Sequence, residues 1–271
     1  MNNFSLLGSI YKNTKPEEII NFFKNINQQI IKPSEILIVL DGPIKSSVRC
    51  KLRYFCNKKY KVRIICNKRN EGLGEALKLG INNCKYDLIF RTDFDDNNRY
   101  DRFYKQIKYF KKTGAQIIGS NLKIFAINKK NIRKVPEYDV KIKNMLKFRN
   151  PINHQTVAFK KKFILKIGNY EKINFFDDYY LWLKANKNNL TFYNIQDTLV
   201  STVSNDELFK RRGGVNYFRS MVSFCKIVKK KKLIKFSFFS FFIRILIALV
   251  PNIMRIKFYE NFLRKNYHSS F

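Results

Sequence analysis

The chain has 271 residues, enough for one large hydrophobic core or two modest ones, which excludes a small fold held together by disulfides. Its 54 lysine and arginine residues exceed its 20 acidic residues and give a net charge of +34, which favours a polyanionic partner such as anionic lipid or a phosphorylated ligand. Lys, Asn, Ile, Phe and Tyr, all encoded by A/T-rich codons, are abundant, so charge alone does not lead us to expect a nucleic-acid partner.

The cysteines and the N-terminal residues indicate the compartment. Five cysteines, an odd number with no C-x-x-C pair, are typical of a reduced interior. The first sixteen residues, MNNFSLLGSIYKNTKP, have no basic segment followed by a long apolar run, so no signal peptide is predicted. We therefore expect the main domain to stay in the cytoplasm.

Short apolar segments alternate with helical patterns in the first part of the chain. Strands are predicted over residues 5–11, 35–42, 62–67 and 86–93, and helices over residues 16–29, 72–84 and 97–110. The run EILIVLDG at 35–42 is almost continuously apolar, as in a parallel strand buried on both faces. This alternation predicts an α/β sheet with right-handed crossovers.

The second half of the chain is less regular. Strands are predicted over 115–125 and 156–161, and helices over 163–170 and 177–186. After about Asn205 the composition becomes basic and apolar. We therefore divide the chain into a first half (1–112), a second half of the same domain (113–205) and a helical tail (206–271).

Carboxylates cluster where two of the predicted strands end. Asp41 and Asp93 both stand at strand carboxyl ends, where α/β sheets bind ligands, so they are expected to line one crevice. The stretch FRTDFDDNN adds Asp95 and Asp96 to Asp93, and the D-x-D spacing turns alternate side chains to the same side. Such oxygen ligands suit Mg²⁺ or Mn²⁺. The alternative is a solvated acidic loop that caps the helix over 97–110.

Several other kinds of site are disfavoured. The GLG of residues 72–74 is followed by Leu77 where a dinucleotide-binding fingerprint has its third glycine, and no P-loop motif is present. His154 and His268 are the chain's two histidines, too few for a multi-histidine metal site.

Six segments in order resemble the family 2 glycosyltransferases of the GT-A fold, particularly bacterial enzymes of amylovoran, capsule and lipopolysaccharide assembly. They are SLLGSIYKN, PSEILIVLDGP, NEGLGEALKLG, FRTDFDDNNRYDRFYKQ, NPINHQTVAFKK and FDDYYLWLKA. The resemblance covers roughly residues 4–214. It implies a mixed sheet with helices on both faces, in which 1–112 is the nucleotide-sugar-binding half and 113–205 the acceptor-binding half. A basic and apolar helical tail that associates with the membrane would follow over 206–271.

The resemblance also implies roles for individual residues on the donor side. Tyr11 would pack near the base and Asp41 would bind it, while Asp93 and Asp95 would hold the ribose and the metal-bound diphosphate. The remaining wall of the nucleotide pocket would be lined by Arg69, Asn70 and Gly72. Asp95 is the first expected ligand of a Mg²⁺ or Mn²⁺ ion, and Asp96 is expected only to cap the following helix.

The second acid pair, Asp177 and Asp178, precedes an apolar helix. The family usually has Glu-Asp at this place, so the resemblance implies that Asp178 is the base and Asp177 its support. Asp177 is shorter than the usual glutamate, which leaves the division of roles between the two acids open. The alternative for this pair is a helix N-cap. His154 would lie on the acceptor side or be structural, and Trp182 is expected in the core.

Two basic segments follow the domain. Arg211 and Arg212 lie in KRRGG, either a loop that closes over the diphosphate or a solvated charge run. Residues 236–250 are apolar apart from Ser237, Ser240 and Arg244 and have basic flanks, which is typical of a helix lying in an anionic membrane surface. The alternatives for this segment are a hairpin packed on the domain, a dimer interface or a membrane span.

Together these features predict a metal-dependent, inverting glycosyltransferase on the inner face of the cell membrane. It would move a hexose or N-acetylhexosamine from a nucleotide-sugar, expected to be a UDP-sugar, to a hydroxyl of a lipid-linked surface glycan. One alternative is a nucleotidyltransferase that makes a nucleotide-sugar. The other is an inactive basic protein that binds membrane or nucleic acid.

Overall fold

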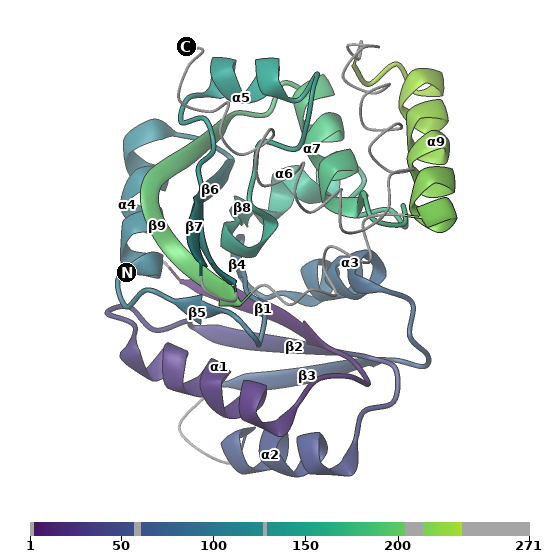
Figure 1. The fold of residues 1–271 in the computed structure, drawn as a ribbon. Coiled ribbons are helices and arrows are strands. Elements are labelled where there is room, and N and C mark those ends of the chain that lie inside the picture. The colour runs from purple at the N-terminus through teal and green to yellow at the C-terminus, as the bar shows by residue number, and fades with distance from the viewer. Residues whose placement is uncertain (1–2, 57–60, 127–128, 204–213, 235–271) are drawn as a thin grey trace.

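The computed structural model describes residues 3–56, 61–126, 129–203 and 214–234. Within these residues the strands form one mixed sheet in the order β3-β2-β1-β4-β8-β6-β9-β5, with β7 beside β6 (Figure 1). The strands are β1 (Phe4–Ile10), β2 (Glu35–Asp41), β3 (Val62–Asn67), β4 (Leu88–Arg91), β5 (Asn97–Asn98), β6 (Ile117–Ala126), β7 (Lys129–Arg133), β8 (Ala158–Lys160) and β9 (Phe192–Val203). The helices are α1 (Pro16–Gln28), α2 (Ser46–Cys56), α3 (Leu73–Asn83), α4 (Arg102–Thr113), α5 (Asp139–Met145), η1 (His154–Thr156), α6 (Lys161–Lys166), α7 (Asp177–Lys187) and α9 (Gly214–Lys230).

The first four strands are parallel, as predicted. β1 lies between β2 and β4, with Leu7 opposite both Leu37 and Arg91. Every residue of β2 is buried, because helices cover both faces of this part of the sheet. The parallel order places the carboxyl ends of β1, β2 and β4 at one edge of the sheet, where a ligand crevice is expected.

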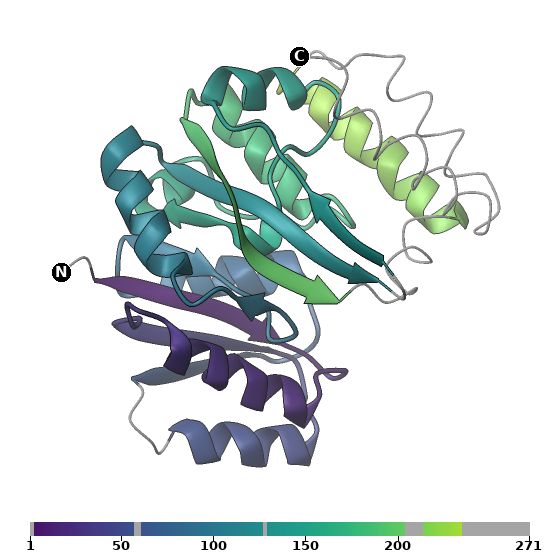
Figure 2. The same ribbon diagram turned by 60° about the vertical axis from the view of Figure 1, so that its left-hand side comes forward.

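The second part of the sheet is mixed. β8 runs antiparallel to β4 and β6, whereas β6 and β9 run parallel with an irregular register between Ser120 and Leu122. Figure 2 shows β6 and β9 side by side above the parallel strands. Strand β9 was not predicted from the sequence, because Asn194, Gln196 and Asp197 interrupt its apolar pattern.

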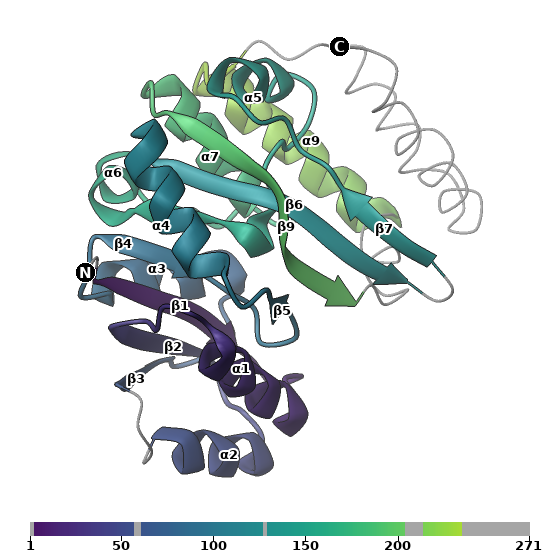
Figure 3. The same ribbon diagram turned by 90° about the vertical axis from the view of Figure 1, so that its left-hand side faces the viewer.

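The hydrophobic core forms one layer on each face of the sheet. One layer contains residues of α1, α2 and α4, and the other contains residues of α3, α5, α6, α7 and α9. Figure 3 shows α1 and α4 in front of the sheet, with α3, α7 and α9 behind it. The predicted mixed sheet with helices on both faces is confirmed.

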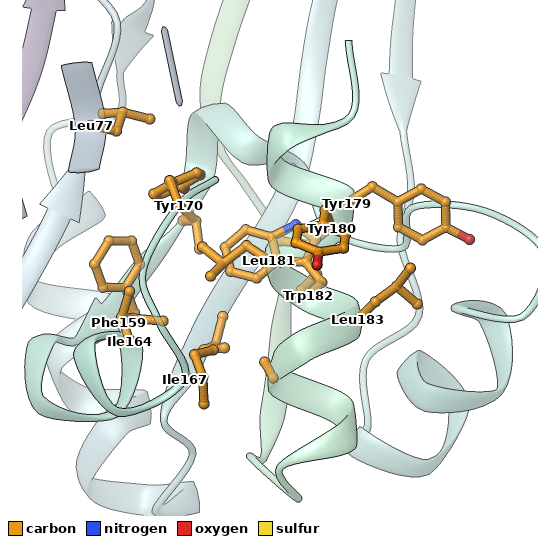
Figure 4. Packing of buried hydrophobic residues seen from close by; sticks show 14 of the residues in the cluster. Leu77, Phe159, Ile164, Ile167, Tyr170, Tyr179, Tyr180, Leu181, Trp182 and Leu183 are labelled. Carbon is orange, nitrogen blue, oxygen red and sulfur yellow. The ribbon is translucent and has the colours of Figure 1, made fainter. Parts of the chain in front are cut away.

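Helix α7 is the most apolar part of the second layer. Tyr179, Tyr180, Leu181, Trp182 and Leu183 are all buried, which confirms the prediction that Trp182 belongs to the core. Figure 4 shows Leu181 directed toward the neighbouring core residues while Tyr179 points to the opposite side of the helix. This burial holds the first turn of α7, with its two aspartates, in a fixed place.

Helix α9 extends the same layer. Met221, Phe224 and Val228 are buried in it, and the Phe224 ring stacks on Phe176 with centroids 4.7 Å apart. The described part of the predicted tail therefore packs against the helix that bears the second acid pair. The apolar segment 236–250 lies outside the described residues, and no helix within them has the length and hydropathy to cross a membrane.

Candidate active site

Asp41 organises the loop between β3 and α3. Its Oδ1 accepts hydrogen bonds from Asn67 Nδ2 and the backbone N–H of Glu71, and its Oδ2 accepts one from the Gly72 N–H, each at 2.9 Å. The carboxylate is 4% exposed. Buried and bonded in this way, Asp41 fixes the backbone that carries the predicted nucleotide-pocket residues.

The backbone at the end of β2 lies very close to this loop. Gly42 has a φ of +85°, and a Cβ on it would stand 2.6 Å from the backbone nitrogen of Asn70. Glycine is therefore required at this position. The Asn70 amide also donates to the carbonyl of Asp41 at 3.3 Å. Strand end and loop thus form one rigid wall of the crevice.

Two other predicted nucleotide-side residues are exposed. Tyr11, 39% exposed, follows β1 at the same edge of the sheet. The Arg69 side chain projects into solvent and pairs with Glu71 at 2.5 Å. Both are accessible to a ligand. The basic pair Arg211 and Arg212 lies outside the described residues.

The acidic segment after β4 is built around buried arginines. Arg91 forms an ion pair with Asp93, and Arg102 donates to the Asn98 side chain and to the Arg91 carbonyl. Burial raises the pKa of Asp93, and the charge of Asp95 raises it further, although Arg91 opposes the shift. The Asp93 carboxylate thus has the buried Arg91 guanidinium as one charged neighbour and the exposed Asp95 carboxylate as another.

Asp96 does not cap the following helix. The structure begins that helix, α4, at Arg102, while the intervening Asn97 and Asn98 form β5 and pair with β9. The Asp96 side chain is buried, and its Oδ2 has no hydrogen-bond partner among the described residues. Burial and the charges of Asp93 and Asp95 raise its pKa well above the ordinary value. The capping role of Asp96 is therefore wrong, and the solvated-loop alternative is wrong for Asp96, whereas Asp95 is exposed.

The predicted metal ligands fit a cation that is shared with a substrate. No group of three His, Cys, Asp or Glu side chains that could hold a metal occurs in the described part of the chain. A Mg²⁺ ion, however, is often bound by one or two carboxylates together with substrate phosphates and water. Exposed Asp95, with Asp93 two residues before it, offers this smaller ligand set.

The second acid pair begins α7, but the helix N-cap is Phe176, so the capping alternative is wrong. Asp177 Oδ1 accepts a hydrogen bond from the Ile173 N–H at 2.6 Å. Asp178 accepts from Asn150 Nδ2 and from the Tyr179 N–H, each at 2.7 Å. The two carboxylates thus have different environments. Asp177 is bonded to the backbone of the loop before the helix, whereas Asp178 is bonded to the Asn150 side chain.

Asp177 also joins the acid pair to the donor side. A Cβ on Gly74, in the first turn of α3, would stand 2.8 Å from the Asp177 carboxyl carbon. The absence of a side chain at Gly74 lets the acid pair approach the loop that Asp41 organises. Burial raises the pKa of Asp177 to about 6, and the charges of Asp178 and Glu75 contribute.

This shift predicts a pH effect on stability. Because the folded-state pKa of Asp177 is higher than that of an unfolded aspartate, the native protein binds more protons between about pH 4 and pH 6. Stability should therefore fall as pH rises through this window. Asp177→Asn, which cannot ionise, should flatten the decline in urea-unfolding experiments at pH 4, 5, 6 and 7. An unchanged slope would contradict the assignment.

Tyr170 lies among the charged residues of both acid groups. Burial raises its pKa, as do the charges of Asp178, Asp177 and Asp93, whereas Arg91 lowers it. The charges of both predicted acid groups therefore act on one buried phenol. Tyr170 and Arg91 were missed in the sequence, where an isolated tyrosine or arginine carries no motif.

His154 packs against Tyr170. Its Nε2 lies 2.7 Å from the Tyr170 hydroxyl, and burial, followed by the charge of Arg91, lowers its pKa well below the ordinary value. The imidazole is therefore neutral. In the described residues it joins no metal-binding group, which leaves it as part of the wall beneath the acid residues.

Comparison with known proteins identifies the family. The model of the family described as "Glycosyl transferase family 2" matches residues 9–168. The chain belongs to this family. An Escherichia coli relative, "UDP-Gal:alpha-D-GlcNAc-diphosphoundecaprenol beta-1,3-galactosyltransferase", is 33% identical over 97% of this chain and 97% of its own length. The "Amylovoran biosynthesis glycosyltransferase AmsE" of Erwinia amylovora is 28% identical over 92% of this chain and 94% of its own.

Solved structures confirm the GT-A-like fold of this family 2 glycosyltransferase. The structure "S. aureus TarS 1-349 in complex with UDP-GlcNAc" matches with a TM-score of 0.63, covering 99% of this chain and 73% of that one. The sequences are 13% identical, so this likeness concerns the fold alone. The family, the fold and the predicted resemblance therefore agree.

Proposed function

We propose that this glycosyltransferase moves a hexose or N-acetylhexosamine from a UDP-sugar to a hydroxyl of a lipid-linked surface glycan, with inversion at the anomeric carbon. The observation that carries the proposal is the contact between Asp177 and Gly74, which joins the acid pair of α7 to the predicted nucleotide pocket. A donor in that pocket would have its sugar next to a carboxylate able to act as a base.

The donor side of the proposal rests on the wall built by Asp41. Its loop presents Asn70 and Gly72 at the end of the parallel sheet, the usual place for a nucleotide in an open α/β fold. The name of the E. coli relative contains UDP-Gal, which supports a UDP-sugar as donor.

A divalent cation, Mg²⁺ or Mn²⁺, would be held mainly by Asp95, with Asp93 as the second ligand. When bound, it would supply positive charge to the diphosphate that leaves with the nucleotide. The buried Arg91 guanidinium forms an ion pair with Asp93, and this pair would orient the Asp93 carboxylate toward the cation.

Asp178 is the proposed base. It would take the proton from the acceptor hydroxyl as that oxygen attacks the anomeric carbon opposite the leaving diphosphate. The hydrogen bond from Asn150 Nδ2 orients the carboxylate, and the buried residues of α7 fix the helix that carries it. A single base on the acceptor side is what an inverting reaction requires.

The lipid-linked acceptor is supported by the relatives. The E. coli protein is named for a diphosphoundecaprenol-linked GlcNAc and the E. amylovora protein for amylovoran biosynthesis. An acceptor of this kind resides in a membrane, which agrees with the proposed association of the basic chain with an anionic membrane surface on the cytoplasmic side.

A transfer assay tests the proposal. The purified protein is incubated with Mn²⁺, radiolabelled UDP-galactose, UDP-glucose or their N-acetyl forms, and a short-chain GlcNAc-diphospholipid. The expected result is one labelled product with inverted anomeric configuration by proton NMR. In a parallel incubation with UTP and a sugar 1-phosphate, formation of a UDP-sugar and pyrophosphate would favour a nucleotidyltransferase. Absence of both reactions, with salt-sensitive binding to polyanions, would favour an inactive basic protein.

A further inference from the structure

A groove runs along α9 where the chain approaches α7. It consists of two adjoining cavities of about 490 and 440 Å³ between the segment 172–177 and the helix. Both cavities are lined by Asn174, Arg219 and Ser220, so they form one continuous surface. One end of this groove is lined by Asp177 of the second acid pair.

The end of the groove nearest the acid pair suits a sugar. It is lined by Asp177, Phe175, Asn174 and Asn216, which offer hydrogen-bonding groups beside an aromatic ring. Phe175 is 49% exposed and has a φ of +66°, an uncommon conformation for a large side chain. The Phe175 and Tyr217 rings meet edge to face with their centroids 5.4 Å apart, and this contact keeps the exposed Phe175 ring in place at this end of the groove.

The middle of the groove is cationic. Arg219 is exposed, lines both cavities and forms no ion pair with any other described residue. Lys172 lines the second cavity and contacts Glu71 at 3.4 Å, with more than half of its side chain exposed. A guanidinium that has no carboxylate partner is suited to a phosphate, which it can bind with two parallel hydrogen bonds.

The far end of the groove is less polar. Ile173 and Ile227 line the second cavity, and α9 then ends at Lys229 and Lys230. From the acid pair outward, the groove therefore offers groups suited first to a sugar, then to phosphate, then to an apolar chain. A lipid-linked sugar diphosphate has its parts in this order.

We propose that this groove binds the acceptor as a sugar-diphosphate-lipid, with Arg219 holding the diphosphate. The inference rests on the proposed function and adds the residues that recognise the acceptor. The donor diphosphate is proposed to lie at Asp93 and Asp95, which line neither cavity. Since consecutive Cα atoms are 3.8 Å apart, a sugar next to Asp177 also lies within reach of the proposed base, Asp178.

Calorimetric titration of the full chain with farnesyl diphosphate tests the groove without requiring turnover. Arg219→Ala should weaken binding by about tenfold or more, as expected for loss of a charged hydrogen bond. Arg219→Lys should recover part of the affinity. Lys229→Ala, which removes an exposed charge from the same helix outside the groove, should bind like the wild type. Saturating UDP should not displace the probe.

Three results would overturn the groove assignment: equal binding by Arg219→Ala, an equal loss in Lys229→Ala, or displacement of the probe by UDP. Titration of each variant with UDP separates this inference from the proposed function. If UDP binds but Arg219 is irrelevant to farnesyl diphosphate, only the groove assignment fails. If farnesyl diphosphate binds through Arg219 but no nucleotide binds, the groove stands and the transferase proposal fails.

Discussion

Replacing Asp178 with asparagine should lower the rate of sugar transfer by about 10²–10⁴-fold, the usual contribution of a general base, while leaving donor affinity unchanged. Asparagine has nearly the same shape, and its carbonyl oxygen keeps one of the two hydrogen bonds that the carboxylate accepts from Asn150 and the Tyr179 N–H, so the buried helix α7 should stay folded. The loss would then be due to the missing proton acceptor.

Single-turnover rates and calorimetric titration with UDP-sugar measure these two quantities separately. Asn150→Ala is the companion variant, because it removes the hydrogen bond that orients Asp178 but keeps the carboxylate. We expect a smaller loss of rate there, with the pH profile preserved. A parallel fall in donor affinity in Asp178→Asn would show that Asp178 belongs to the donor pocket and is not the base.

Asp95→Asn should weaken metal-dependent donor binding and lower turnover together. A metal ion that neutralises a leaving diphosphate supplies several kcal/mol, so loss of its main protein ligand should reduce turnover by about 100-fold or more. Donor titrations in Mn²⁺ and in EDTA measure the effect. For the variant, the two titrations should give nearly the same affinity.

Asp96→Asn is the matched control for this experiment. Asp96 is adjacent in sequence but buried, and its raised pKa means that a neutral amide replaces it at little electrostatic cost. We expect its donor affinity to remain metal-dependent. If Asp96→Asn loses the metal effect and Asp95→Asn keeps it, the assignment of the ligands is wrong.

The parallel half of the fold was predictable because its strands are nearly uninterrupted apolar runs. Residues 35–41 of β2 are an example, since burial on both faces leaves no polar position in the middle of the strand. β9 could not be found in this way. Its polar residues are satisfied by tertiary partners, as when Asn194 donates to the carbonyls of Pro136 and Pro151.

The candidate site was predictable to the extent that its residues stand at strand ends or in motifs. Asp41 and Asp93 follow from the sheet order, but the support of Asp93 by Arg91 depends on the local conformation of the chain. The role of Asp96 could not be predicted, because the sequence indicated a helix that begins at residue 97. In the structure Asn97 and Asn98 form β5, and α4 begins at Arg102. The position of helix α9 beside α7 could not be predicted either, because it depends on the packing of Phe224 against Phe176, two residues that are distant in the sequence.

Thermal unfolding of the purified chain with UDP-, GDP-, CMP- and dTDP-sugars, each with Mn²⁺ and with EDTA, tests the central claim most directly. A ligand at about 100 times its Kd adds about 2.7 kcal/mol to the stability of the folded state, which should raise Tm by about 5 °C or more. We predict that UDP-sugars raise Tm with Mn²⁺ and not with EDTA. If no nucleotide-sugar raises Tm while anionic lipid or nucleic acid does, the account of a metal-dependent transferase is contradicted.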